Sequence, residues 1–161
     1  MERSNTESKY ILAGFLKFMG LDLEKIVKGR IENRIKAQKF VYFGEKLEVP
    51  LGYDFDIYLY GPYSSKLADD YYNISREEWE AGTIDLSEGE KRTLHYLKEK
   101  DALFMEVAAT FDSLKSANNK VSNDRLIDMI SSIKTNRLKE KGKNKVYMEM
   151  VVKELSQHEL L

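Results

Sequence analysis

Two pairs of carboxylates are the most direct candidates for chemistry in this sequence. Asp54 and Asp56 alternate along a segment with strand character, so both would point to one face, and Asp69 and Asp70 are adjacent. Neighbouring carboxylates can share a proton or hold a divalent cation. The same spacing is typical of the solvent-facing side of an alternating strand, and we favour this plainer interpretation.

The motifs of most familiar catalytic and metal sites do not occur. The sequence has no cysteine, which excludes disulfides, zinc–thiolate sites and thiol nucleophiles. The two histidines, His95 and His158, lack the spacing of metal ligands. Glycine-rich phosphate-binding loops and the nucleophile elbow are also missing. We therefore predict no catalytic residue, no metal site and no cofactor.

Tyrosine is concentrated in one part of the chain. Six of the ten tyrosines fall between Tyr53 and Tyr72. Tyrosine is favoured at protein interfaces, and aromatic rings near bases can stack on nucleobases. Residues 69–90, however, contain eight acidic residues and one arginine, which disfavours nucleic acid there. Core packing is the favoured interpretation and a protein interface is the alternative.

Basic residues gather in two stretches although the net charge is −1. Residues 17–39 contain seven Lys or Arg against three acids, and residues 134–145 contain six against one. Such stretches are usually solvated helix surface, but they could contact phosphates. The candidates for nucleic-acid contact are Lys36, Lys39, Lys139, Lys141, Lys143 and Lys145.

The elements that position these residues are predicted to be mostly helices, because only 2 prolines interrupt 161 residues. The second half of residues 22–48 is apolar on two sides, which predicts a central helix, with a break near Gly29. Ser75 with Glu78, and Ser87 with Glu90, match capping boxes. The other predicted helices cover residues 8–19, 64–73, 87–100, 101–114, 124–133 and 146–155.

One strand is predicted from the alternation between Tyr53 and Tyr60. It would pair with the run at residues 83–86 or remain an isolated extended segment, and Gly61–Pro62 would form a turn. Residues 116–123 and 139–144 read as loops. The predicted fold is therefore mainly α: a compact multi-helix domain around a central helix with a small β element, compatible with a winged-helix-like arrangement.

Residues 34–72 carry a composite motif: Q-K-h-V-Y (h apolar) on the central helix, then Y-G-P-Y-S, then L-A-D-D. This segment, about a quarter of the chain, resembles the YwgA-like family of bacteria and archaea. It is distantly similar to the Panacea domain of antitoxins and proteolytic adaptors. The resemblance implies a mainly helical fold and a regulatory or protein-binding role rather than catalysis. The matching residues are Gln38, Lys39, Val41, Tyr42, Tyr60, Gly61, Pro62, Tyr63, Ser64, Leu67, Ala68, Asp69 and Asp70.

The motif also has a purely structural interpretation, as a corner of the fold. Gly61 permits a sharp turn, and Ser64 can cap the following helix. Tyr60 and Tyr63 could lay their rings on the central helix and direct their hydroxyls to Gln38. If the motif instead forms a binding surface, the interaction candidates are Gln38, Lys39, Tyr42, Tyr58, Tyr60, Gly61, Pro62, Tyr63 and Ser64.

The length predicts a single domain, residues 1–161. Residues 8–86 would be the family-like core and residues 87–158 a helical C-terminal part of the same domain. The first eight residues do not resemble a signal peptide, and no apolar run reaches the about 20 residues of a membrane span. We expect a cytoplasmic protein with no membrane partner.

Two functions from different classes fit these observations. The favoured one is a non-enzymatic regulatory or protein-interaction module, antitoxin-like or adaptor-like, with an unidentified protein partner. The alternative is a DNA-binding transcriptional regulator with a winged-helix-like fold, which requires the two basic stretches to meet on one face. An enzyme is less favoured, and a purely structural subunit is the remaining class; a homodimer is one assembly that the sequence allows.

Overall fold

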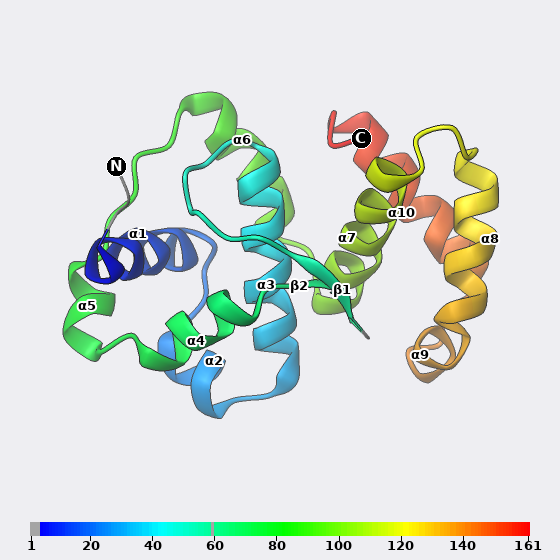
Figure 1. Ribbon diagram of the computed structural model, residues 1–161. Helices are drawn as coiled ribbons and strands as arrows, with labels where there is room; N and C mark the ends of the chain where they lie inside the picture. Colours follow the sequence, from blue (N-terminus) through cyan, green and yellow to red (C-terminus); the bar gives the residue numbers. More distant parts are fainter. Residues whose placement is uncertain (1–3, 59) are drawn as a thin grey trace.

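The computed structural model describes residues 4–58 and 60–161, which are mainly helical with one two-stranded antiparallel sheet (Figure 1). The predicted fold class is thus confirmed. The helices are α1 (Asn5–Phe18), α2 (Leu23–Lys28), α3 (Ile31–Lys46), α4 (Ser65–Asn73), α5 (Arg76–Ala81), α6 (Glu88–Lys98), α7 (Ala102–Ala117), α8 (Asn123–Ile133), α9 (Thr135–Glu140) and α10 (Lys145–Gln157), and the strands are β1 (Asp56–Tyr58) and β2 (Gly61–Tyr63).

Helix α3 runs through the middle of the fold, as predicted. It packs against α1 and α2 on one side and against β2 and α7 on the other (Figure 1). The predicted break near Gly29 separates α2 from α3, because Gly29 adopts an extended conformation there. A Cβ at this position would lie 2.2 Å from the carbonyl oxygen of Lys25, so the break has no room for a side chain.

Helix α7 is buried on every side from Ala102 to Asp112. The spacing of Leu103, Val107 and Phe111 in the sequence predicts an amphipathic helix with these residues on its apolar face. The exposed opposite face implied by that pattern is absent over these residues, because α3 and β2 cover one side of α7 and α8 and α10 cover the other. Buried apolar side chains from both parts of the chain accordingly belong to one continuous core.

The β hairpin differs from the predicted strand in both length and partner. Strand β1 pairs with β2 in the register Asp56↔Tyr63 and Tyr58↔Gly61, so Gly61 and Pro62 belong to a strand and not to a turn. Tyr53, expected to begin the strand, is held by helices instead: its N–H donates to Glu45 Oε1 (2.9 Å) and its hydroxyl to Asp70 Oδ2 (2.6 Å).

Residues 83–86, the expected strand partner, pass over α1 instead. The crossing is close, since a Cβ at Gly14 would lie 2.3 Å from the carbonyl carbon of Thr83. Ile84 and Leu86 pack against the core beside it. This segment therefore packs on α1 and does not pair with β1.

The helix starts follow the predicted caps. Ser64 Oγ accepts a hydrogen bond from the N–H of Leu67 at the start of α4. The two capping boxes, Ser75 with Glu78 and Ser87 with Glu90, are both formed, at the starts of α5 and α6. Two helices are missing from the predicted set. For α5 only the capping box at its start was predicted, and α9 lies between the predicted helix 124–133 and the predicted loop 139–144, whose first residues it includes. The buried residue of α9 is Leu138.

Among the described helices, none combines the length and the apolar content that crossing a bilayer requires.

Candidate functional site

The two halves of the composite motif meet through the main chain of β2. The side-chain amide of Gln38 donates to the carbonyl oxygen of Ser64 (3.0 Å) and accepts from the Ser64 N–H (2.8 Å). The ammonium of Lys39 donates to the carbonyl oxygen of Pro62 (2.6 Å). The sequence predicted that Gln38 would receive the hydroxyls of Tyr60 and Tyr63; its amide instead pairs with the main chain of Ser64 as a neighbouring strand would, and the tyrosine that it contacts is Tyr71.

Gly61 allows β2 to lie directly against α7. Its φ of +95° falls in the left-handed region, which favours glycine. A Cβ there would lie 2.5 Å from Thr110 Oγ1. Both constraints require glycine at the point where the motif contacts the buried helix.

A buried cluster of charges lies next to this contact. Glu106 of α7 is completely buried and accepts from Lys134 Nζ (2.8 Å) and from Arg137 Nε (3.0 Å). The Arg137 guanidinium also lies 5.4 Å from the centre of the Tyr60 ring. Helix α7 is thereby linked to α9 and to the hairpin.

Lys39 adds a third cation to the cluster. Only 1% of the residue is exposed, and this burial lowers the pKa of its amine from 10.5 to about 7. The carboxylate of Glu106 opposes that shift, and the nearby positive charge of Lys134 adds to it. Lys39 therefore changes its charge near neutral pH in a place that water hardly reaches.

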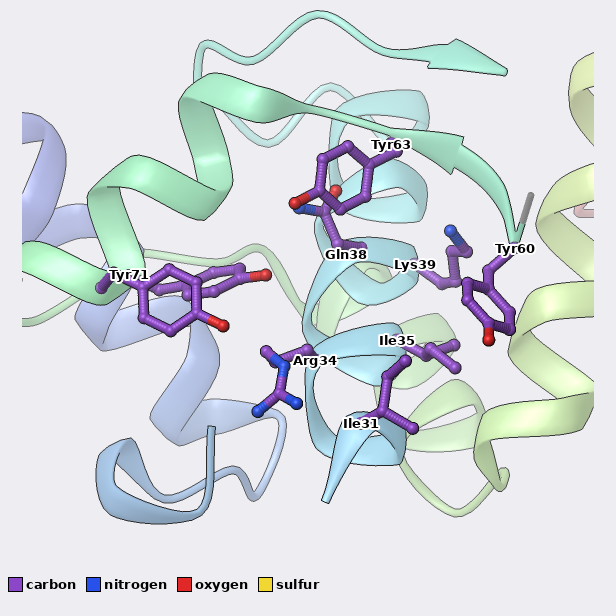
Figure 2. A pocket seen from close by; sticks show the side chains of 9 residues that line it. Ile31, Arg34, Ile35, Gln38, Lys39, Tyr60, Tyr63 and Tyr71 are labelled. Carbon is purple, nitrogen blue, oxygen red and sulfur yellow. The ribbon is translucent and has the colours of Figure 1, made fainter. Parts of the chain in front are cut away.

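A cavity of about 240 Å³ opens beside the motif, between α3, the hairpin and α4 (Figure 2). We call it the tyrosine groove. Figure 2 shows the rings of Tyr60, Tyr63 and Tyr71 arranged around it, with Gln38 behind them. Burial raises the pKa of Tyr71, so its hydroxyl stays protonated at neutral pH. The groove is lined by Ile31, Arg34, Ile35, Gln38, Lys39, Tyr60, Tyr63, Tyr71 and Tyr72.

Large apolar side chains are exposed at the edges of the groove. Ile31 is 42% exposed and Tyr72 is 49% exposed, although both line the cavity. A smaller cavity of about 190 Å³ on the hairpin side shares Lys39, Tyr60 and Tyr63 with it. Ile57 and Tyr58 of β1 are also exposed. An apolar cavity surrounded by exposed aromatic and aliphatic side chains is suited to holding a side chain of another molecule.

Most interaction candidates from the sequence lie at this groove or form its frame, but Tyr42 does not. Its hydroxyl donates to Asp112 Oδ2 (2.6 Å), and its ring packs edge-on against Phe55. Lys46 also pairs with Asp112 and donates to the carbonyl oxygen of Leu160 (2.6 Å). Tyr42 therefore connects α3 to α7 and does not line the tyrosine groove.

The nucleic-acid candidates divide into buried and exposed residues. Lys39 is buried and is not accessible to a phosphate backbone, so the prediction that it contacts nucleic acid is wrong. Lys36 is half-buried, with its ammonium 5.6 Å from the Phe40 ring centre. Lys145 pairs with Asp128 at 2.5 Å. The remaining three, Lys139, Lys141 and Lys143, are exposed.

The two basic stretches approach each other at Glu32. Lys141 Nζ lies 3.9 Å from the Glu32 carboxylate, and both residues line a cavity of about 190 Å³ together with Lys143. The contact between the two basic stretches is thus made by the acidic Glu32 of α3, whose carboxylate would repel a phosphate.

The carboxylate pairs remain apart from any candidate centre. Asp54, Asp56 and Asp69 are exposed, and Asp70 accepts from Tyr53 and from Lys66 Nζ (2.7 Å). Within residues 4–58 and 60–161, no group of three or more His, Asp or Glu side chains is placed to hold a metal ion.

Several residues at the site had no place among the sequence candidates. Arg34, Tyr71 and Tyr72 line the groove, and Glu106 with Arg137 forms the buried charge cluster. One signal was available for Glu106, since it is a lone carboxylate within an otherwise apolar stretch of α7. Tyr71 and Tyr72 belong to the cluster of six tyrosines between residues 53 and 72. Arg34 and Arg137 reach the site from other helices, and no local pattern marks them.

Comparison with known proteins gives no match for this chain, whether with family models, with curated proteins or with solved structures.

Proposed function

We propose that this protein is a non-enzymatic regulatory module that binds a protein partner through the tyrosine groove. The observation that carries the proposal is the apolar cavity itself, lined by four tyrosines and bordered by the exposed Ile31 and Tyr72. Tyrosine contributes large contact areas at interfaces with little loss of conformational entropy. The resemblance of residues 34–72 to YwgA-like and Panacea proteins supports the same class, antitoxin-like or adaptor-like.

The size of the cavity favours a protein partner over a metabolite. Small-molecule sites commonly enclose about 300–1,000 Å³. The tyrosine groove, at about 240 Å³, lies just below that range and would accommodate one large side chain. Interfaces often place a single such residue from the partner in a central pocket.

Site-specific photo-crosslinking in cells of the source organism tests the proposal. A photoreactive benzoylphenylalanine would replace Tyr72 in one variant and Val146 in a control variant. Val146 is 67% exposed on α10 and lines neither the groove nor the cavities that share Tyr60 with it, so it reports non-specific contact. We expect one discrete crosslinked protein from the Tyr72 position and none from Val146.

The purified partner then allows a quantitative measurement. Tyr72→Ala should weaken its binding by about 1–3 kcal/mol in calorimetry, whereas Val146→Ala should leave it unchanged. Equal crosslinking from both positions, or a Tyr72→Ala variant that binds as well as the wild type, would refute the proposal.

A DNA-binding regulator is the second candidate, favoured by the exposed Lys139, Lys141 and Lys143. Anisotropy with a fluorescent DNA duplex tests it at low and at physiological salt, because phosphate contacts weaken steeply as salt rises. Binding that a Lys141→Gln, Lys143→Gln variant loses would favour DNA, and no binding at low salt would remove this candidate. The winged-helix-like arrangement, the cytoplasmic location and a homodimer stay predictions.

A further inference from the structure

The charged side chains that line the tyrosine groove are all basic. Its lining contains the permanently charged Arg34 and no carboxylate; the other basic residue of the lining, Lys39, is buried and has a pKa of about 7. The nearest acids of α4 do not alter this, because Asp70 is paired with Lys66 and Tyr53 while Asp69 lies outside the lining. An apolar pocket with a cationic group suits an apolar ligand that carries negative charge beside it.

Hydrogen bonds to the main chain fix the guanidinium of Arg34 at the wall of the groove and leave part of it unbonded. Its Nη1 donates to the carbonyl oxygens of Ile26 (2.9 Å) and Gly29 (3.1 Å), which close the end of α2. No other hydrogen bond or ion pair of the Arg34 side chain occurs among residues 4–58 and 60–161. Figure 2 shows the group between Tyr71 and Ile31. A guanidinium fixed at one nitrogen is prepared to bind a carboxylate with the others.

The surroundings of Arg34 extend the positive charge beyond a single point. Lys28 and Arg30 are exposed just before α3, next to Ile31 at the edge of the groove. Glu32, the acid in the middle of this stretch, lies near Lys141 and is partly offset by it. Charge spread along the surface in this way complements several carboxylates better than one.

We propose that the occupant of the tyrosine groove is an acidic peptide segment of the partner protein, whose single large apolar residue enters the cavity while flanking carboxylates bind at Arg34 and Arg30. This inference deepens the proposed function and rests on it. The apolar residue supplies buried area against the tyrosines, and the carboxylates set the register and speed association.

Three fluorescein-labelled peptides of equal length test the chemistry of the occupant. The first has a phenylalanine flanked on both sides by glutamates, the second has the same phenylalanine flanked by lysines, and the third replaces the phenylalanine of the first by alanine. We expect saturable binding of the first in anisotropy and at least about tenfold weaker binding of the other two. The affinity for the first should fall as salt is added.

Variants of the protein locate the binding. Arg34→Gln should weaken the acidic phenylalanine peptide about tenfold, the effect of losing a charge-assisted contact. Because Arg34 also supports α2, Arg30→Gln gives a second reading: the Arg30 side chain has no hydrogen bond among the described residues, and its loss should weaken the peptide about threefold. Arg125→Gln, an exposed arginine on α8, is the matched control and should change nothing.

Three outcomes would overturn the inference: no binding of the acidic phenylalanine peptide at about 1 mM, equal binding of the lysine-flanked peptide, or equal loss in Arg34→Gln and Arg125→Gln. These results are separable from a failure of the proposed function. If crosslinking at Tyr72 captures a partner while the peptides show no preference for acidic flanks, the groove binds protein and only the charge assignment is wrong.

Discussion

The ammonium of Lys39 donates to the carbonyl oxygen of Pro62 at 2.6 Å, so the second residue of the Q-K motif holds the third residue of Y-G-P-Y-S. This bond lies in the interior, and the buried amine has a pKa of about 7. The motif is therefore tied to a group whose protonation changes in the physiological range, and the first prediction follows from it.

Replacing Lys39 by methionine should alter how stability depends on pH. In the unfolded chain the amine keeps its proton up to about pH 10.5, whereas the folded protein releases it above about pH 7. Because the unfolded state then binds more protons, wild-type stability gains with rising pH between these values. The Lys39→Met variant lacks this gain. Its free energy of unfolding relative to wild type should fall by roughly 2–3 kcal/mol between about pH 6 and about pH 9.

Urea denaturation at several pH values measures this difference. The lost hydrogen bond to Pro62 adds a cost that does not depend on pH, so only the trend carries the test. A constant difference between variant and wild type would mean that Lys39 does not titrate in this window.

Replacing Glu106 by glutamine should destabilise the protein strongly. The carboxylate pairs with Lys134 and Arg137 inside the core, and Lys39 lies close enough to feel its charge. Removing one partner of a buried ion pair costs about 3–5 kcal/mol, since the remaining charges lose their compensation. Glu99→Gln, at an exposed residue after α6, is the control and should change the urea midpoint little. A loss under about 1 kcal/mol for Glu106→Gln would show that water reaches the cluster.

Gly61→Ala should cost more stability than Gly52→Ala. Both glycines have positive φ, +95° and +87°, so both substitutions carry the backbone cost of about 1 kcal/mol or more. A Cβ at Gly52 meets nothing within 4 Å, whereas one at Gly61 would lie 2.5 Å from Thr110 Oγ1. The melting temperature of Gly61→Ala should therefore be lower than that of Gly52→Ala. Adding Thr110→Ala to Gly61→Ala should restore part of the lost stability. Equal losses would mean that β2 moves away from α7 without cost.

Gln38→Leu should loosen the start of α4. It removes the partner of the Ser64 N–H, and a buried main-chain group left unpaired costs about 1–3 kcal/mol. The Ser64 carbonyl oxygen loses its bond from Gln38 but still accepts from the Ala68 N–H (3.1 Å). Hydrogen exchange at the Ser64 amide should speed up by more than the change in global stability explains. Asn33→Ala, which removes an exposed 3.4 Å bond, is the matched control. Unchanged protection at Ser64 would argue against the strand-like role of Gln38.

The sequence was most informative where a pattern is local. The central position of α3 followed from its two apolar sides, and the caps at Ser75 and Ser87 followed from their spacing of three residues to Glu78 and Glu90. Patterns of this kind need only neighbours along the chain, so they survive whatever the rest of the fold does.

Predictions failed where distant residues decide. The strand expected from Tyr53 begins later because Glu45 and Asp70 take the hydrogen bonds of Tyr53. Helix α9 was missed because short helices gain most of their stability from packing, which here is the burial of Leu138. The tyrosine groove likewise combines α3, the hairpin and α4, so only the cluster of tyrosines pointed to it.

Helix α7 has a consequence for how the chain reaches its final state. Its neighbours come from both ends of the sequence, α3 and β2 before it and α8 and α10 after it. During synthesis, the apolar side of α3 that packs against α7 stays exposed until α7 has been made. The side of α7 that packs against α10 then stays exposed until α10 has been made. We expect the nascent chain to acquire protease resistance in one late step, and the two pieces 1–100 and 101–161, produced separately, to gain structure only when they are mixed.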